Sequence, residues 1–227
     1  LTRFPNAVTE LHGKYYWNLM GLYQALREGL VACNKEGVVP ESIGIDTWGV
    51  DVVPIAEDGS ILSMPRAYRD PYTVGMPEKY FEKISKEVVY EKTGIQIMNF
   101  NTLYQIFAGM ETGYVPMKQA KYLLFMPDAL AYMLTGEKVC EYTISSTSQI
   151  LNPRTKDFEK ELLEAAGVDA SVFSKPVMPG TVVGTLTDAL AQYSRLGKVN
   201  VVSVAGHDTA SAVAAVPALD ENFAYLS

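Results

Sequence analysis

The chain has 227 residues, of which 48% are hydrophobic, 20% are charged and 11% are aromatic, which is an ordinary globular composition. The aromatic content and the lack of low-complexity tracts exclude a disordered chain. Acidic residues outnumber basic residues by 26 to 19, which gives a net charge of −7. We therefore expect no nucleic-acid partner, because phosphate contacts need clustered Lys and Arg.

The two cysteines and the two histidines lie far apart in the sequence and match no zinc-ligand spacing. We interpret Cys33 and Cys140 as buried structural thiols. A low cysteine count fits a reducing compartment, and no stretch approaches roughly 18 uninterrupted apolar residues. We therefore expect a cytoplasmic protein with no membrane partner. The chain starts at Leu1 and ends in a strand-like run at Ser227, from which we expect a fragment of a longer protein.

Apolar residues at three- and four-residue spacing predict the clearest helix over residues 18–36, with Asn18 as its N-cap and Gly37 beyond its end. The same spacing and helix-stop signals predict further helices over residues 78–92, 102–109, 127–134, 158–166 and 208–216. Short apolar runs predict strands over residues 42–47, 50–55, 61–64, 181–183 and 198–205. Asp58-Gly59 predicts a hairpin turn. Because strands and helices alternate, we expect an α/β fold.

Two polar clusters follow predicted strands, at the position where ligands bind in an open α/β sheet. One contains Asp208, which we interpret either as a helix N-cap or as a general base that faces a cleft. The general-base interpretation is favoured by Gly206, which would let a ligand approach the backbone, and by the hydrogen-bonding side chains of His207 and Thr209.

The other cluster is Asp46-Thr-Trp-Gly-Val-Asp51. Its two aspartates could form a metal pair, but their spacing fits no recognised cation loop, and roles in a turn and a hairpin are the simpler interpretation. Trp48 is either a core residue or an aromatic surface for a sugar, because the neighbouring aspartates would supply acceptors for hydroxyl groups.

Other polar segments allow a structural or a ligand-binding role. Arg69-Asp70 is either a surface ion pair or part of a site rim, and Asn99 and Asn101 are either helix caps or ligand contacts. The sequence contains no GxxxxGK[ST] or GxGxxG loop and no Gly-x-Ser-x-Gly elbow. A P-loop enzyme, a dinucleotide-binding enzyme and a serine hydrolase therefore have little support.

Seven short strings occur in the order and approximate spacing seen in the FGGY carbohydrate kinases, a family of the actin/hexokinase-like superfamily. They are Gly44-Ile-Asp-Thr-Trp-Gly-Val-Asp51, Ala67-Tyr-Arg-Asp70, Phe100-Asn-Thr-Leu-Tyr-Gln105, Met126-Pro-Asp128, Leu134-Thr-Gly136, Glu141-Tyr-Thr143 and His207-Asp-Thr-Ala-Ser-Ala-Val213. The chain resembles this family over essentially its whole length. The first and last strings are specific, and they resemble most the members that act on L-rhamnulose.

The resemblance implies a ribonuclease-H-like domain, with a mixed sheet and flanking helices, that holds the sugar in residues 1–216. It implies that residues 217–227 begin a C-terminal ATP-binding domain, and that most of this domain and the N-terminal strand are missing here. The implied reaction transfers the γ-phosphate of ATP, with Mg²⁺, to the primary hydroxyl of L-rhamnulose. The implied partners are this sugar and the missing ATP domain.

By resemblance, Asp208 is the catalytic proton acceptor, and Gly49, His207 and Thr209 contact the sugar. The resemblance places no nucleotide-binding or metal-binding residue in this chain, so we expect the chain to be inactive alone. Two alternatives remain open: a kinase for another deoxyketose, such as L-fuculose, and a sugar-binding module without catalysis.

Overall fold

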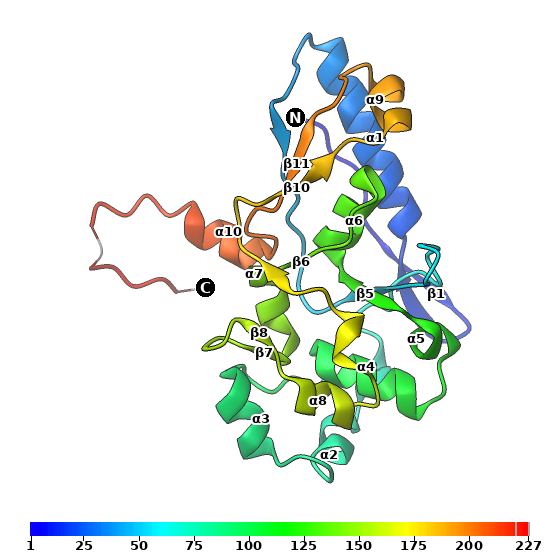
Figure 1. Ribbon diagram of the computed structural model, residues 1–227, viewed down its shortest axis with the longest axis vertical. Helices are drawn as coiled ribbons and strands as arrows, with labels where there is room; N and C mark the ends of the chain where they lie inside the picture. Colours follow the sequence, from blue (N-terminus) through cyan, green and yellow to red (C-terminus); the bar gives the residue numbers. More distant parts are fainter. Residues whose placement is uncertain (221, 227) are drawn as a thin grey trace.

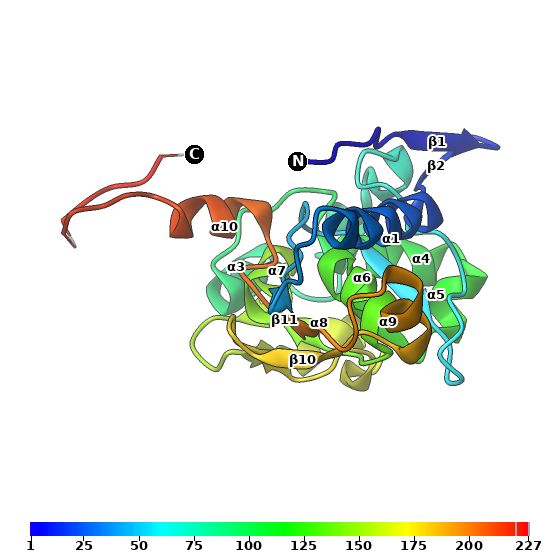
Figure 2. The same ribbon diagram turned by 90° about the horizontal axis from the view of Figure 1, so that it is seen from above.

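The computed structural model describes residues 1–220 and 222–226. It begins with an antiparallel hairpin of β1 (Val8–Leu11) and β2 (Lys14–Trp17), in which Val8 pairs with Trp17. The hairpin lies on the same side of the molecule as helix α1 (Leu19–Lys35) (Figure 2). No strand was predicted in this part of the sequence.

Helix α1 matches the helix predicted over residues 18–36. It begins after Asn18, whose side chain accepts a hydrogen bond from the backbone N–H of Gly21 at 2.9 Å. Beyond its end, Gly37 has a φ of 71°, a conformation that glycine adopts without strain. Leu19, Leu22 and Leu30 form its buried face. Both predicted ends of this helix are therefore confirmed.

A mixed three-stranded sheet has the order β10 (Val182–Thr185), β11 (Asn200–Val202) and β3 (Ser42–Ile43). Strand β11 is parallel to β3 and antiparallel to β10. These strands lie within or beside the runs predicted over 42–47, 181–183 and 198–205. The parallel pairing continues past the strands as a single bridge between Thr47 and His207.

Strand β4 (Val52–Ile55) is wholly buried and pairs antiparallel with β5 (Tyr122–Phe125). The predicted Asp58-Gly59 turn is present, because the N–H of Ala56 donates to the carbonyl of Ser60 at 2.9 Å. The second arm predicted over 61–64 makes only one bridge, between Ile55 and Ile61, so β5 is the main partner of β4.

The helix predicted over residues 78–92 is wrong, because two helices occupy this region: α2 (Met76–Tyr80) and α3 (Lys86–Thr93). The Ser85 side chain accepts a hydrogen bond from the N–H of Val88 at 3.4 Å and caps a new helix there. The four other predicted helices are present as α4 (Thr102–Glu111), α6 (Met126–Thr135), α8 (Lys160–Ala165) and α10 (Asp208–Ala214).

Several short elements lie where no element was predicted. They are the 3₁₀ turns η1 (Pro71–Thr73), η2 (Ser146–Ser148) and η3 (Ala170–Val172), the helices α5 (Val115–Gln119), α7 (Tyr142–Ser145) and α9 (Asp188–Ser194), and the strands β6 (Cys140–Glu141), β7 (Leu151–Asn152), β8 (Asp157–Phe158) and β9 (Pro176–Val177). Most have two to five residues, too few for an apolar period to be visible in the sequence.

Helix α4 lies at the centre of the largest hydrophobic cluster, and its residues 102–109 are all buried. Helices α2, α3 and α8 lie around it, whereas α10 projects from the body of the molecule (Figure 1). The mixture of short sheets and packed helices confirms the predicted α/β class. Cys140 is buried as predicted and Cys33 is only half-buried. Among the residues described, no helix is both long enough and apolar enough to span a bilayer.

Candidate functional site

The two polar clusters of the sequence meet at one edge of the molecule. The N–H of Thr47 donates to the carbonyl of Gly206 at 2.9 Å, and the N–H of Asp208 donates to the carbonyl of Thr47 at 2.8 Å. These bonds hold the chain after β3 beside the chain after β11. Residues about 160 positions apart in the sequence therefore form one surface.

A cleft of about 510 Å³ opens at this edge, a size typical of small-molecule sites. It is lined by residues from both strand ends and from three further segments: Trp48, Gly49, Val50, Tyr68, Ile95, Gln96, Met98, Phe100, Asn101, Ser146, Thr147, His207 and Asp208. Three of the four predicted site residues line it. The fourth, Thr209, lies directly after Asp208.

Asp208 is the first residue of α10, and the N-cap is His207. The N-cap interpretation of Asp208 is therefore wrong. The carboxylate is 57% exposed and accepts hydrogen bonds from the N–H of Thr209 at 2.6 Å and from the Thr209 hydroxyl at 3.3 Å. The Nε2 atom of His207 lies 3.4 Å from the same oxygen, Oδ1. This arrangement leaves the carboxylate accessible to a ligand hydroxyl.

Gly49 lies where a side chain would collide with Thr147. A Cβ atom at position 49 would lie 3.0 Å from the Thr147 Cγ2 atom and 3.1 Å from its hydroxyl. The same hydroxyl accepts a hydrogen bond from the N–H of Val50 at 3.1 Å. The absence of a side chain at Gly49 thus allows the strand end to pack against η2.

The backbone after Gly49 is strained. Val50 has a φ of 67°, a genuine outlier for a β-branched residue, and the N–H of Asp51 donates to the carbonyl of Gly49 at 2.9 Å. The hydroxyl of Thr102 in α4 donates to the Val50 carbonyl at 2.6 Å. Strained turns of this kind persist where the surroundings fix them, and they cluster at ligand sites.

Asp51 is not half of a metal pair. Its carboxylate is buried and accepts hydrogen bonds from the indole N–H groups of Trp17 and Trp48 at 2.6 and 3.0 Å, whereas Asp46 is exposed. Burial raises the pKa of the Asp51 carboxyl to about 6, although its hydrogen bonds lower the pKa. No group of three or more His, Cys, Asp or Glu side chains that could hold a metal ion occurs within residues 1–220 and 222–226.

Aromatic rings form one part of the cleft lining. Trp48 lies against Trp17 with ring centroids 4.3 Å apart, and Tyr68 lies 5.6 Å from Phe100. Trp48 lines the cleft and also packs, half-buried, against the hydrophobic cluster that contains Leu19 and Val53. Polar side chains form another part, including His207 and Asp208. A lining that combines aromatic faces with polar side chains suits a sugar, which presents both C–H faces and hydroxyl groups.

The predictions for two other polar segments are tested in part, and a ligand contact of Asn99 or Asn101 stays a prediction. Asp70 pairs with Arg66, at 2.5 Å between Nη2 and Oδ2, and the Arg69 guanidinium lies over the Tyr68 ring at 5.1 Å. Asn101 occupies the N-cap position of α4 but makes no capping bond. Its amide instead donates to the side-chain oxygen of the buried Gln149 at 2.9 Å.

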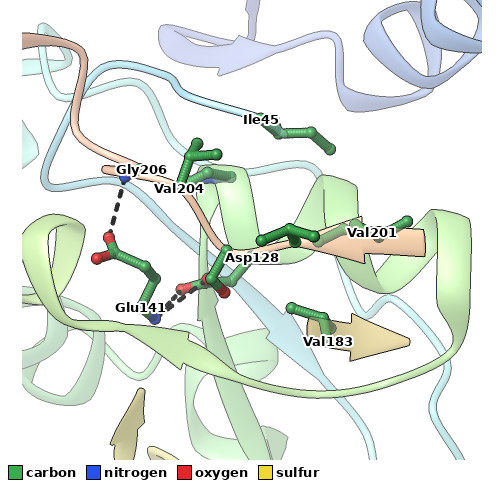
Figure 3. Close-up of a pocket in the computed structure, with 11 residues that line it drawn as sticks. Ile45, Asp128, Glu141, Val183, Val201, Val204 and Gly206 are labelled. Carbon is green, nitrogen blue, oxygen red and sulfur yellow. Dashed lines mark hydrogen bonds between the residues drawn. The ribbon is translucent and has the colours of Figure 1, made fainter. Parts of the chain in front are cut away.

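A buried chain of hydrogen bonds supports the segment that carries His207 and Asp208 (Figure 3). The carboxylate of Asp128 accepts from the N–H of Glu141 at 3.2 Å, and the Glu141 Oε2 atom accepts from the N–H of Gly206 at 3.1 Å. The Thr143 hydroxyl donates to the same Glu141 oxygen at 2.7 Å and accepts from the N–H of His207 at 3.3 Å. Burial raises the pKa of Asp128 well above its usual range.

The small cavity in Figure 3 lies beside this chain and is lined by Asp128, Glu141 and Gly206 together with several valines. Its volume of about 10 Å³ is at the lower limit for one water molecule, so it cannot take a sugar. The open cleft with Asp208 is the candidate ligand site.

The sequence reasoning missed the structural roles of Asp51, Glu141 and Thr143, and it missed Ser146 and Thr147 as cleft residues. A signal existed for three of them, because Asp51, Glu141 and Thr143 lie in strings that carry the family resemblance. Nothing local in the sequence marks Ser146 or Thr147, which reach the cleft only through the fold.

Comparison with known proteins decides the family. The family model described as the N-terminal domain of the FGGY family of carbohydrate kinases matches residues 5–215. The chain belongs to the FGGY family. Among curated FGGY relatives, the chain is 51% identical over 227 residues to the rhamnulokinase of Bacteroides thetaiotaomicron, a match that covers 100% of the chain and 47% of the relative. It is 41% identical to the rhamnulokinase of Ligilactobacillus salivarius, with 99% and 46% covered.

Solved structures of FGGY kinases share the fold. The xylulose kinase of Rhodospirillum rubrum superimposes with a TM-score of 0.82 at 15% identity, over 91% of this chain and 44% of that one. The Plasmodium falciparum glycerol kinase with ADP gives a TM-score of 0.74 at 15% identity, over 91% and 43%. The chain thus spans about half the length of the proteins it matches.

Proposed function

We propose that this chain is the sugar-binding and catalytic-base half of a carbohydrate kinase that phosphorylates L-rhamnulose. The observation that carries the proposal is the exposed carboxylate of Asp208 in a cleft that also contains His207 and Gly49. Membership of the FGGY family supports the reaction class. The rhamnulokinase names of its relatives support the substrate.

In the proposed reaction, the sugar's primary hydroxyl attacks the γ-phosphorus of ATP. The new P–O bond forms as the bond to the ADP oxygen breaks, and Asp208 takes the hydroxyl proton. The products are the sugar 1-phosphate and ADP. In this proposal His207, Thr209 and Gly49 contact the sugar. The cleft restricts the position and orientation of the bound sugar, so that little further rotational and translational entropy is lost in reaching the transition state.

We also propose that residues 1–216 form the sugar domain and that residues 217–227 lead into the ATP-binding domain. The family match over residues 5–215 supports this division. Mg²⁺ is expected with ATP by family membership, but the described residues offer no cluster of metal-ligating side chains, so we assign no magnesium ligand to this chain. The ATP domain is therefore the partner that catalysis needs.

The direct test is calorimetric binding of L-rhamnulose, L-fuculose, D-xylulose and glycerol to the 227-residue chain. We expect L-rhamnulose to bind most tightly. A preference for L-fuculose would keep the reaction class and change the substrate. No binding of any of the four would contradict the proposal.

Catalysis is tested by completing the chain with the part of the Bacteroides thetaiotaomicron relative that it does not match. We expect Asp208→Asn to lower the rate of ADP release by at least about 10²-fold while the sugar affinity changes little. The matched control is Asp46→Asn, an exposed aspartate outside the cleft, which should leave both unchanged. If the completed protein bound sugar but Asp208→Asn released ADP normally, Asp208 would not be the base. If it bound sugar without any ADP release, a binding module would be favoured.

A further inference from the structure

We propose that Asp51 is a positioning residue that fixes Trp48 and Tyr68 as the aromatic wall of the cleft, and that it thereby sets the affinity for the ligand. The inference rests on the proposed function only in taking that ligand to be a sugar. Asp51 does not line the cleft, so it acts through its neighbours.

The Asp51 carboxylate gathers donors from four parts of the chain. Its Oδ2 atom accepts from the Trp17 indole at 2.6 Å, the Trp48 indole at 3.0 Å and the N–H of Tyr68 at 3.3 Å. Its Oδ1 atom accepts from the Gln105 amide in α4 at 2.9 Å. Only an ionised carboxylate can accept at both oxygens without presenting a proton of its own.

Because Asp51 is buried, its donors have no alternative hydrogen-bond partner in solvent. Asp51 is 1% exposed, so each donor would lose its partner if the carboxylate were removed, and water could not replace it. The Trp48 ring packs against the hydrophobic cluster that contains Leu19 and Val53, which leaves its orientation to two further contacts. These are its N–H bond to Asp51 and its contact with the Trp17 ring at 4.3 Å. Both of these contacts depend on Asp51, because it also holds Trp17.

Trp17 is the less obvious part of the proposal. It lies at the end of β2 and does not line the cleft, yet its ring lies against the Trp48 ring, with the two centroids 4.3 Å apart. The β1–β2 hairpin is therefore coupled to the ligand site through Asp51. A change at Trp17 should alter ligand affinity although it touches no ligand.

The chain provides its own probe, because Trp17 and Trp48 are its only tryptophans. The near-ultraviolet circular dichroism of the indoles reports directly on this pair. We expect Asp51→Asn to change this signal strongly, because an amide leaves one acceptor oxygen for several donors. We also expect it to raise the Kd for L-rhamnulose by about tenfold, since losing one such support costs about 1.4 kcal/mol.

The matched control is Asp70→Asn. Asp70 is also a buried carboxylate, and it accepts from the N–H of Tyr15 in the same strand β2 at 2.7 Å, but it holds no cleft residue. Its variant should keep the indole signal and bind sugar within about twofold of the wild type. Thermal unfolding gives the highest temperature at which every variant is still folded, and all binding and spectroscopic comparisons are made below that temperature.

If Asp51→Asn does not fold, Trp17→Phe tests the same coupling, because it keeps a ring but removes one donor. We expect a several-fold rise in Kd from Trp17→Phe. Unchanged sugar affinity in the folded variants would overturn the inference. If the wild type binds none of the sugars, the proposed function fails. The indole signal then decides this inference. An unchanged indole signal in Asp51→Asn, or an unshifted Trp48 fluorescence emission in Trp17→Phe, overturns the inference. Loss of the indole signal in Asp51→Asn supports it.

Discussion

The Glu141 carboxylate accepts a hydrogen bond from the backbone N–H of Gly206 at 3.1 Å, and a Cβ atom on Gly206 would lie 2.9 Å from the same oxygen. The close approach of a buried carboxylate to the backbone therefore requires glycine here, directly before His207 and Asp208. Because Pro127 also lies 3.2 Å from the position of that Cβ, the backbone has little room to move away.

We predict that Gly206→Ala destabilises the protein by about 1–3 kcal/mol, the usual cost of overpacking a buried position. The matched control is Gly29→Ala in α1, where a Cβ atom would meet nothing within 4 Å. The control should stabilise the protein by about 0.5–1 kcal/mol, because alanine favours a helix interior. Urea unfolding measures both values, and equal effects of the two substitutions would contradict the packing argument.

The Thr143 hydroxyl is predicted to order the segment that carries His207. It joins the buried Glu141 carboxylate to the N–H of His207, so Thr143→Val leaves both without this partner. Hydrogen exchange of the amides in residues 205–209 should become faster in Thr143→Val, and the cost in stability should be about 1–3 kcal/mol. Thr143→Ser keeps the hydroxyl and should exchange like the wild type. Identical exchange in Val and Ser variants would rule out this role.

The parts of the site that could be predicted are those that lie in one short string. Asp208 and His207 follow an apolar run, so a strand-end argument finds them, whereas Gly49 was assigned to the site by the family resemblance alone. Asp51 could not be assigned its role, because its partners Trp17 and Gln105 are 34 and 54 residues away. A sequence shows that an aspartate is present, but it does not show which donors the fold will bring to it.

The fold shows the same limit. The long amphipathic helix α1 was predicted with both ends, because its period and caps are local. Strand β5 was not predicted, since its apolar run continues into α6 without a break, and periodicity cannot separate a buried strand from a buried helix. The predicted helix over 78–92 failed because one capping serine, Ser85, outweighed a continuous apolar period.

Gly49 is predicted to tolerate a methyl group only if Thr147 becomes smaller. Gly49→Ala would place its Cβ 3.0 Å from the Thr147 Cγ2 atom, so the cleft wall must shift and sugar affinity should fall by about tenfold. Thr147→Ser removes that methyl and keeps the hydroxyl that accepts from the N–H of Val50. The double variant should therefore recover part of the affinity in calorimetry. No recovery would show that the loss has another cause.

The stability of the protein is predicted to depend on the ionisation of Asp51. Its pKa in the folded protein is about 6, against 3.8 for an ordinary aspartate, so the folded state holds more protons than the unfolded state between these values. Stability from this group is therefore full below about pH 4 and is lost as the pH rises through about 6. The loss amounts to about 3 kcal/mol, at 1.36 kcal/mol for each pKa unit.

Urea unfolding between pH 4.5 and 7.5, compared between the wild type and Asp51→Asn, measures this contribution. The comparison is needed because the lowered pKa values of Glu159 and Asp188 act in the opposite direction, and the raised pKa of Asp128 acts in the same direction. The contributions of these groups cancel when the unfolding free energy of Asp51→Asn is subtracted from that of the wild type. We expect the wild type to lose stability relative to the variant as the pH rises through about 6. A difference that stays constant across this range would show that Asp51 is already ionised at an ordinary pKa, with its four donors outweighing burial.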